Sequence, residues 1–139
     1  MIIKKYNYLP EEAREIRSEV FVNEQGFLDE FDDIDGIAKH MIIYEQEQPI
    51  STCRIYFSTK NQSYVIGRIA VIKEWRGKNI GASMLKAAED NIRQLGGKSA
   101  MLSAQVRAKG FYEKQGYNMQ GIAYLDEECP HIWMRKNLE

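Results

Sequence analysis

A short basic segment after an apolar stretch has the residue types of a phosphate-binding site. Residues 64–72 are nearly all apolar, and residues 76–82 read Arg-Gly-Lys-Asn-Ile-Gly-Ala before a long amphipathic stretch. The first turn of a helix leaves backbone N–H groups without partners and carries partial positive charge. Small residues such as Gly77, Gly81 and Ala82 let an anion approach that backbone closely. The segment therefore predicts a binding site for a pyrophosphate.

Two common nucleotide-binding motifs do not fit this segment. A Walker loop requires the pattern GxxxxGK[ST], which is absent from the chain. A dinucleotide-binding fingerprint requires GxGxxG inside a βαβ unit with an acidic residue downstream, and that spacing is absent too. The pyrophosphate site therefore belongs to another class of nucleotide-binding protein.

The acidic, thiol and imidazole side chains do not form a recognisable metal site. Placing Gly36 at the turn position of an EF-hand loop puts Phe31 at its first position and Ile42 at its last, and neither can bind calcium. The cysteines and histidines lack the spacing of zinc ligands. We therefore expect no metal, and we expect both thiols to be reduced. These four residues are Cys53, Cys129, His40 and His131.

The spacing of apolar residues predicts the helices that would position these groups. A helix of about 16 residues, roughly 25 Å long, is expected to end at Gly96 and Gly97. Its apolar side chains recur every four residues with two leucines beside them: Ile80, Met84, Ala88, Ile92, Leu85 and Leu95. An earlier helix begins near Pro10, and a third covers residues 106–115. The earlier helix has Ala13, Ile16, Arg17, Val20 and Phe21 on one face.

Six strands are predicted, and their order with the helices indicates the fold class. The strand at 64–72 is rich in β-branched residues and is expected to be buried on both faces. The chain then reads β, α, three β, α, β, α, β, which is typical of an α/β fold with a mixed, mostly antiparallel central sheet and helices on both faces. No linker or repeat interrupts residues 1–139, so one domain is predicted. The strands are expected at 2–6, 39–46, 49–58, 64–72, 98–103 and 131–136.

The composition of the chain argues against two classes of binding partner, nucleic acids and membranes. The 139 residues are 44% hydrophobic and 28% charged, with a formal net charge of −1. A nucleic-acid-binding surface would normally bring clustered basic residues, so no nucleic-acid partner is expected. No apolar run is long enough to span a membrane and the N-terminus is not a signal peptide, so no membrane partner and a cytoplasmic location are expected.

Two motifs resemble those of the Gcn5-related N-acetyltransferases, the GNAT family. The pyrophosphate loop of that family reads Gln/Arg-x-x-Gly-x-Gly/Ala after a strand, and Arg76 to Ala82 fits it, with Asn79 where the first glycine is usual. A second block, Gln105 to Tyr117, is similar to Asn-x-x-Ala-x-x-Phe-Tyr-x-x-x-Gly-Phe, with Gln105 in place of Asn. The early residues, among them Glu24 to Gly26, resemble the small bacterial ElaA- and YjcF-like branch.

The resemblance implies a site for acetyl-CoA as co-substrate. In the family, backbone groups of the buried strand pair with the pantetheine arm, and the loop holds the pyrophosphate. Transferred to this sequence, the cofactor-binding residues are Ile69, Ala70, Val71, Arg76, Gly77, Lys78, Asn79, Ile80, Gly81, Ala82, Ser83, Gln105 and Tyr112. The predicted reaction moves an acetyl group to a primary amine of a small molecule or peptide by direct attack.

Direct attack needs a proton donor for the thiolate and an acceptor for the amine proton. Tyr112 matches the family position near the CoA sulfur and is the predicted donor. Many relatives carry a Glu on the central strand, but residues 64–72 contain no carboxylate. The predicted routes for the amine proton are therefore His131, Glu24, His40 or a chain of water molecules.

Several alternatives stay open. Without a strand carboxylate, the chain could be a CoA-binding regulatory module with no turnover. The N-terminal pattern also resembles acyl-homoserine lactone synthases, which use acyl carrier protein and S-adenosylmethionine, although the CoA loop argues against that chemistry. A homodimer is also left open. An acidic loop is either a solvated surface or a mouth that attracts a cationic amine; its residues are Asp29, Glu30, Asp32, Asp33 and Asp35.

Overall fold

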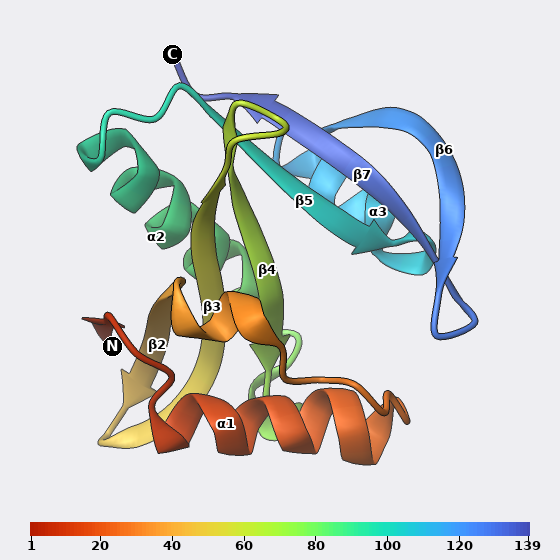
Figure 1. Cartoon of the computed structure of the whole chain (residues 1–139). Helices are drawn as coiled ribbons and strands as arrows, with labels where there is room; N and C mark the ends of the chain where they lie inside the picture. The colour runs from red at the N-terminus through yellow and green to blue at the C-terminus, as the bar shows by residue number, and fades with distance from the viewer.

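Seven strands form one continuous sheet in a computed structural model that describes residues 1–139 (Figure 1). The strand order across the sheet is β1-β2-β3-β4-β5-β7-β6. All neighbouring strands are antiparallel except β4 and β5, which are parallel. The strands are β1 (Ile2–Tyr6), β2 (Lys39–Glu45), β3 (Gln48–Ser58), β4 (Ser63–Val71), β5 (Ser99–Gln105), β6 (Asn118–Asp126) and β7 (Cys129–Asn137).

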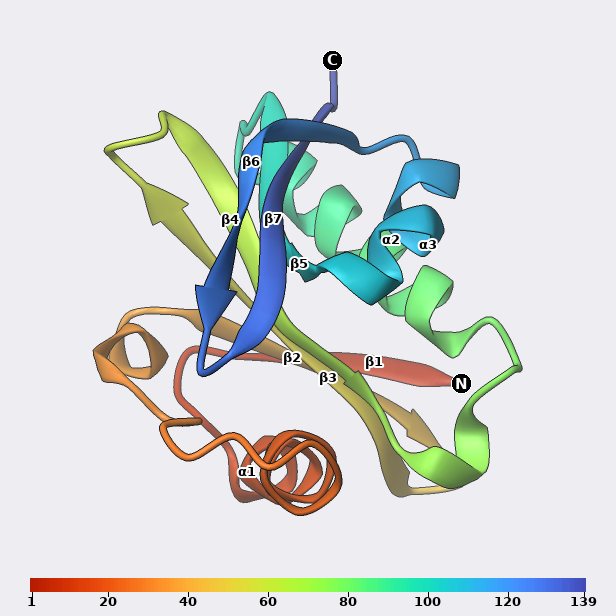
Figure 2. The same ribbon diagram turned by 90° about the vertical axis from the view of Figure 1, so that its right-hand side faces the viewer.

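Helices cover the two faces of this sheet, as Figure 2 shows. Helix α1 (Glu11–Arg17) continues as a wider π-type helix over Ser18–Glu24 and lies on one face, against β2, β3 and β4. Helices α2 (Ile80–Gln94) and α3 (Lys109–Lys114) lie on the other face. None of the helices has the length and apolar composition needed to cross a membrane. The predicted fold class, a mixed and mostly antiparallel α/β sheet with helices on both faces, is confirmed.

Three single-turn helices complete the structure. They are η2 (Asp33–Gly36), η3 (Lys73–Trp75) and η4 (Val106–Ala108). The first includes Asp33 and Asp35 of the acidic loop, the second leads into the predicted pyrophosphate loop, and the third joins β5 to α3. Each therefore sets the direction of a segment that carries predicted site residues.

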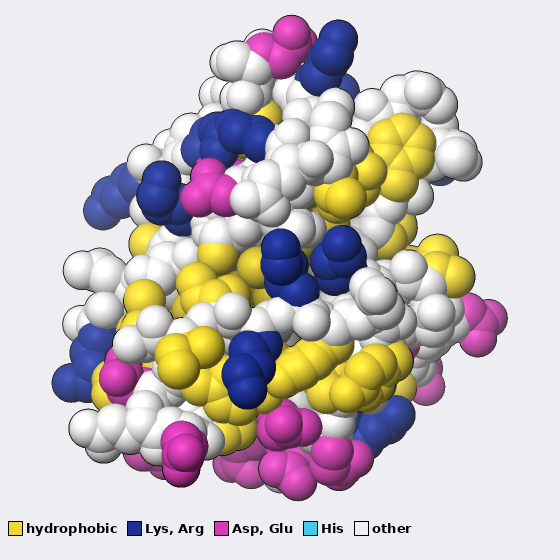
Figure 3. All heavy atoms as spheres, turned by 90° about the vertical axis from the view of Figure 1, so that its left-hand side faces the viewer, with side chains coloured by type: hydrophobic (Ala, Val, Ile, Leu, Met, Phe, Trp, Pro, Cys, Tyr) yellow, Lys and Arg dark blue, Asp and Glu magenta, His cyan; other side chains and the backbone are white.

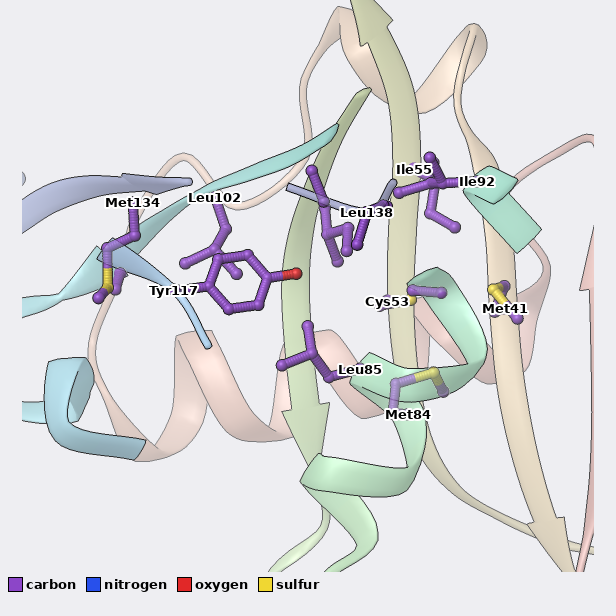
Figure 4. Packing of buried hydrophobic residues seen from close by; sticks show 14 of the residues in the cluster. Met41, Cys53, Ile55, Met84, Leu85, Ile92, Leu102, Tyr117, Met134 and Leu138 are labelled. Carbon is purple, nitrogen blue, oxygen red and sulfur yellow. The ribbon is translucent and has the colours of Figure 1, made fainter. Parts of the chain in front are cut away.

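Helix α2 packs its apolar face against the sheet. Ile80, Met84, Leu85, Ala88 and Ile92 are buried, as their spacing predicts. Figure 4 shows three of these side chains among Met41, Cys53 and Ile55 of β2 and β3, with Leu102, Tyr117, Met134 and Leu138 from the C-terminal half. Leu95, predicted on the same face, is 45% exposed because the helix ends at Gln94.

The two parallel strands separate soon after they meet. Only Tyr64 and Val65 of β4 pair with β5, opposite Ala100 and Met101. Beyond Val65 the β5-facing edge of β4 has no strand partner, and Figure 1 shows β5 running away from β4 at a wide angle. This parting is the geometric origin of the cavity described below.

A β-bulge in β4 coincides with the parting. The register with β3 shifts so that Cys53 lies opposite both Arg68 and Ile69. Arg68 has a φ of 53°, a left-handed conformation that is uncommon outside glycine. The expectation that 64–72 is buried on both faces is therefore wrong for residues 67–69, which are half-buried, and Tyr64, Val71 and Ile72 are half-buried as well.

One strand was missed by the sequence patterns. Residues 118–126 form β6, the outermost strand beside β7, where no strand was expected. Every residue of β6 is exposed, so the strand has no alternation of apolar and polar side chains that a pattern could detect. A bulge at Gly121, with a φ of 76°, also interrupts its pairing with β7.

Acidic side chains gather on one part of the surface. Figure 3 views the molecule from the side of β1 and α2, and acidic groups cluster along its lower margin, where α1 lies. Glu11 and Glu15 are exposed residues of that helix. Hydrophobic side chains form patches across the middle of the same face.

Candidate active site

A cavity of about 730 Å³ lies where β4 and β5 part. One wall is formed by residues 66–71 of β4 and the other by residues 102–105 of β5. The first turns of α3, the loop after the π-type helix and the β6–β7 hairpin complete the lining. Segments from both ends of the chain therefore meet at the unpaired edge of the central strand.

The predicted cofactor residues divide into two groups. Gly77 to Ser83 do not line the cavity, because they form the loop and first turn of α2 beside it. The others line it: Ile69, Ala70, Val71, Arg76, Gln105 and Tyr112. The structure thus provides a cavity wall for the residues expected at the pantetheine arm, with the expected pyrophosphate loop next to Val71.

The loop into α2 presents a row of free backbone donors. No backbone N–H from Gly77 to Ala82 has a hydrogen-bond partner within the protein, and the first helical bond of this turn runs from Ser83 N to Asn79 O at 3.1 Å. Gly77 and Asn79 both adopt positive φ angles, 76° and 61°, which produce the sharp turn. Six successive free N–H groups at a positive helix end fit a diphosphate.

Arg76 is already engaged by protein groups. Its guanidinium donates two hydrogen bonds to the Glu24 carboxylate, each 2.8 Å long, and a third of 3.0 Å to the Val71 carbonyl. The bond from Arg76 lowers the pKa of Glu24. Glu24 does not line the cavity, and its negative charge is paired with Arg76. Its geometry suits a structural link between the π-type helix and the cofactor loop, rather than the proton acceptor predicted for it.

Tyr112 meets the requirements of a proton donor. It lines the cavity from α3, and its hydroxyl has no hydrogen-bond partner in the protein. Its ring packs edge-to-face against Phe111, with 5.0 Å between centroids, and against Tyr117. Burial raises the pKa of Tyr112 to about 12, so the phenol keeps its proton at neutral pH.

His131 meets the requirements of a proton acceptor. It lies on β7, lines the cavity and is 8% exposed. Its Nδ1 lies 2.8 Å from the Cys129 carbonyl, which can only accept, so Nδ1 carries the proton. In the neutral ring Nε2 then has a free lone pair, and no protein group bonds to it. Tyr124 stacks on the ring at 6.0 Å and Phe27 packs against its edge at 6.3 Å, which fixes its orientation.

His40, the other predicted histidine, lies outside the cavity. It is 1% exposed, and its Nε2 bonds to the Asp35 carbonyl at 3.0 Å. Burial lowers the pKa of His40 and keeps the ring neutral. The structure therefore gives His40 a packing role behind the acidic loop.

Three acids of the loop are bound by three arginines. Arg17 contacts Glu30 at 2.8 Å and Asp35 at 2.7 Å, and it is 1% exposed. The other contacts are Arg54 with Asp32 at 2.6 Å and with Asp35 at 2.9 Å, and Arg68 with Glu30 at 3.0 Å and with Asp32 at 3.4 Å. We call these six residues the arginine cluster. These three acids therefore form neither a solvated loop nor a mouth with free negative charge that attracts a cationic amine.

The pKa values of the three acids reflect this pairing. Burial alone would raise the pKa of Asp35, but hydrogen bonds from Arg17, the Asp32 backbone and Arg54 outweigh it and hold that pKa far below its ordinary value. The same balance lowers the pKa of Asp32. For Glu30, burial outweighs its arginine partners and the pKa is raised. The arginine cluster thus has little net charge, and its members Glu30, Asp32 and Arg68 line the cavity.

Other lining residues carried no signal in the sequence. Phe27 follows the π-type helix, and Asp126 and Glu127 lie at the β6–β7 turn. Glu127 accepts hydrogen bonds from the backbone N–H groups of Leu28 at 2.7 Å and Asp29 at 3.1 Å. These residues are about 100 positions apart, so only the tertiary fold brings them together. Of the residues named in these contacts, Asp29 belongs to the acidic loop that the sequence predicted.

Known proteins share this sequence and fold. The sequence model of the acetyltransferase (GNAT) domain matches residues 6–138. The uncharacterized N-acetyltransferase YjcF of Bacillus subtilis is 31% identical over 139 residues, covering 98% of each chain.

Two solved structures show the same fold. The crystal structure of Escherichia coli ElaA has a TM-score of 0.84 at 24% identity and covers 97% of this chain and 98% of its own. An aminoglycoside 6′-N-acetyltransferase complexed with coenzyme A has a TM-score of 0.77 at 15% identity, covering 100% and 98%.

Proposed function

Because the chain belongs to the GNAT family of acetyltransferases, we propose that it moves the acetyl group of acetyl-CoA to a primary amine of a small molecule or a peptide. One observation carries the choice of site: a single cavity, beside a row of free loop amides, contains both the unbonded hydroxyl of Tyr112 and the unbonded Nε2 of His131.

Each part of the cofactor has matching residues. The free N–H groups from Gly77 to Ala82 would hold the pyrophosphate, with Ser83 at the end of that turn. The unpaired edge of β4 at Ile69, Ala70 and Val71 would bind the pantetheine arm, with Gln105 on the facing strand. When bound, acetyl-CoA supplies a thioester whose carbonyl carbon the amine attacks, forming a C–N bond while the C–S bond breaks.

Two side chains then handle the protons. His131 Nε2 accepts the proton that the amine loses on attack, and its Nδ1 bond to the Cys129 carbonyl keeps the accepting nitrogen unprotonated in the neutral ring. Tyr112 donates its phenolic proton to the departing thiolate. The acceptor would bind in the part of the cavity lined by Arg68 at the half-buried bulge and by Glu30 and Asp32 of the arginine cluster.

The test is acetylation of a pool of primary amines and short peptides in the presence of acetyl-CoA, followed by mass spectrometry and by assay of released CoA thiol. We expect acetylated product that requires the protein and forms about a hundredfold more slowly in Tyr112→Phe. Binding of CoA without any product would instead favour the regulatory module. Preference for an acyl carrier protein donor would favour the synthase-type alternative.

A further inference from the structure

Two carboxylates of the cavity have no partner. Five acidic residues line it, against two arginines, Arg68 and Arg76. Both arginines are satisfied by acids: Arg68 by Glu30 and Asp32, and Arg76 by Glu24. Glu127 is also committed, to the backbone of Leu28 and Asp29. The side chains of Asp29 and Asp126 make no hydrogen bond or ion pair.

The fold places these two aspartates together beside His131. The Glu127 carboxylate accepts a hydrogen bond from the backbone N–H of Asp29, so Asp29 lies next to the hairpin turn that carries Asp126. Asp126 follows Tyr124 by two positions on β6, and alternate strand residues share a face. Tyr124 stacks on His131, so Asp126 lies on the same face of the hairpin as the imidazole.

A second feature of the cavity points to a ligand there. His131 lines the cavity and is more than nine-tenths buried, yet its Nε2 makes no hydrogen bond within the protein. The rings of Phe27 and Tyr124 pack against the imidazole, and Phe27 also lines the cavity. The site thus combines one unpartnered acceptor atom, an aromatic ring that can contact a cation, and two unpaired negative charges.

We propose that Asp29 and Asp126 bind a second, protonated amino group of the acceptor, so that the preferred acceptors are diamines. The inference rests on the proposed function and adds the acceptor class. The reacting amine is neutral and lies near His131 Nε2, whereas the other end of the molecule keeps its charge between the two aspartates. A monoamine leaves both carboxylates without a partner and gains nothing from them.

The probes are straight-chain diamines from putrescine upward, each compared with the monoamine in which a methyl group replaces the second ammonium group. We expect the wild type to prefer the diamine in kcat/KM. Asp29→Asn and Asp126→Asn should each reduce that preference about fivefold, the size of a solvent-accessible ion pair. Glu128→Gln is the matched control, because Glu128 follows Glu127 in the same exposed turn and does not line the cavity. Its preference should be unchanged.

Binding is measured alongside turnover, by calorimetry of diamine and monoamine on the CoA-saturated protein. Equal use and equal binding of the two amines would overturn the diamine inference and leave the proposed function standing. An equal loss in Glu128→Gln would also overturn it, because the effect would then be one of overall charge. Tight diamine binding that depends on the two aspartates, without acetylation, would support the inference and contradict the proposed function.

Discussion

A phenol can protonate a departing thiolate only if it still holds its own proton. Burial of Tyr112 has that effect by raising its pKa to about 12. His131 shows the complementary arrangement, because one ring nitrogen is fixed by the Cys129 carbonyl and the other is left free. In the proposed mechanism both roles depend on what each side chain lacks, namely a partner within the protein for one polar atom of a residue that lines the cavity.

Tyr112→Phe is expected to lower kcat about a hundredfold, the usual contribution of general acid catalysis, with little change in CoA affinity. The ring and its contact with Phe111 are retained, so the loss reflects the hydroxyl alone. Steady-state kinetics with calorimetry of CoA binding check this. Because the pKa is raised, wild-type kcat should show no alkaline decline from Tyr112 up to about pH 10. An unchanged kcat in the variant would remove Tyr112 from the mechanism.

His131→Asn is expected to lower kcat/KM about a hundredfold, because it removes the proposed proton acceptor. The Asn amide can still donate to the Cys129 carbonyl in place of Nδ1, but nothing replaces Nε2. Steady-state kinetics, calorimetry of CoA binding and urea unfolding separate a base from a packing residue, because lost packing would also lower CoA affinity or the free energy of unfolding. An unchanged kcat/KM in the variant would contradict the assignment.

Two elements form the proposed cofactor site. Strand β4 leaves β5 after Val65, and α2 begins at Ile80 with its free N–H groups next to that open edge. The link between Glu24 and Arg76 ties the π-type helix to the same loop. The π-type helix and the proposed cofactor loop are therefore joined through one side-chain pair.

Gly81→Asp is expected to weaken CoA binding at least about tenfold, because a carboxylate would meet the pyrophosphate at the first turn of α2. Gly81→Ala is the matched control. A Cβ there would lie 3.6 Å from Phe111 Cζ and 3.9 Å from Val71 Cγ2, which are ordinary contacts, so its affinity should be retained. Calorimetry with CoA compares the two. Equal affinities would show that the pyrophosphate binds elsewhere.

At the scale of the whole molecule, the arginine cluster joins segments far apart in the chain. Arg17 comes from α1, Arg54 from β3 and Arg68 from β4, and all three contact acids between Glu30 and Asp35. The cluster fixes the acidic loop to the sheet and forms the wall behind the acceptor side. Each member contacts two others, so removing one would leave its two partners with only one opposite charge each.

Asp35→Asn is expected to lower the free energy of unfolding at neutral pH by about 1.5 to 3 kcal/mol, because Arg17 and Arg54 lose the carboxylate they share while each keeps one other acid. The pKa of Asp35 is lowered in the folded protein, so its stabilisation is present above the unfolded-state pKa and is lost as pH falls through the folded-state value. The difference between wild type and variant should therefore shrink on acidification. Urea unfolding across that range measures it.

Asp33→Asn is the control for this measurement. Asp33 lies on the same short helix, is exposed and has no ion pair, so its substitution should change stability by less than about 0.5 kcal/mol. A comparable loss in both variants would indicate an effect of overall charge and not of the cluster.

Local patterns in the sequence determined the helices and most of the strands. The four-residue spacing from Ile80 to Ile92 predicts α2, and the basic, glycine-containing loop before it predicts the row of free amides, because both depend only on neighbouring residues. The α/β class follows from the order of those elements. Strand β6 could not be found in this way, since an exposed edge strand has no apolar face to mark it.

The tertiary structure alone decided which side chains share the cavity. No local pattern shows that β4 and β5 part after Val65, that the hairpin brings His131 and Asp126 beside Asp29, or that Arg17 is buried against Asp35. These are contacts between residues distant in sequence, and they arise from the packing of the sheet and its helices. The physical reason is that hydrophobic periodicity encodes which face of an element is buried, but not which other element covers it.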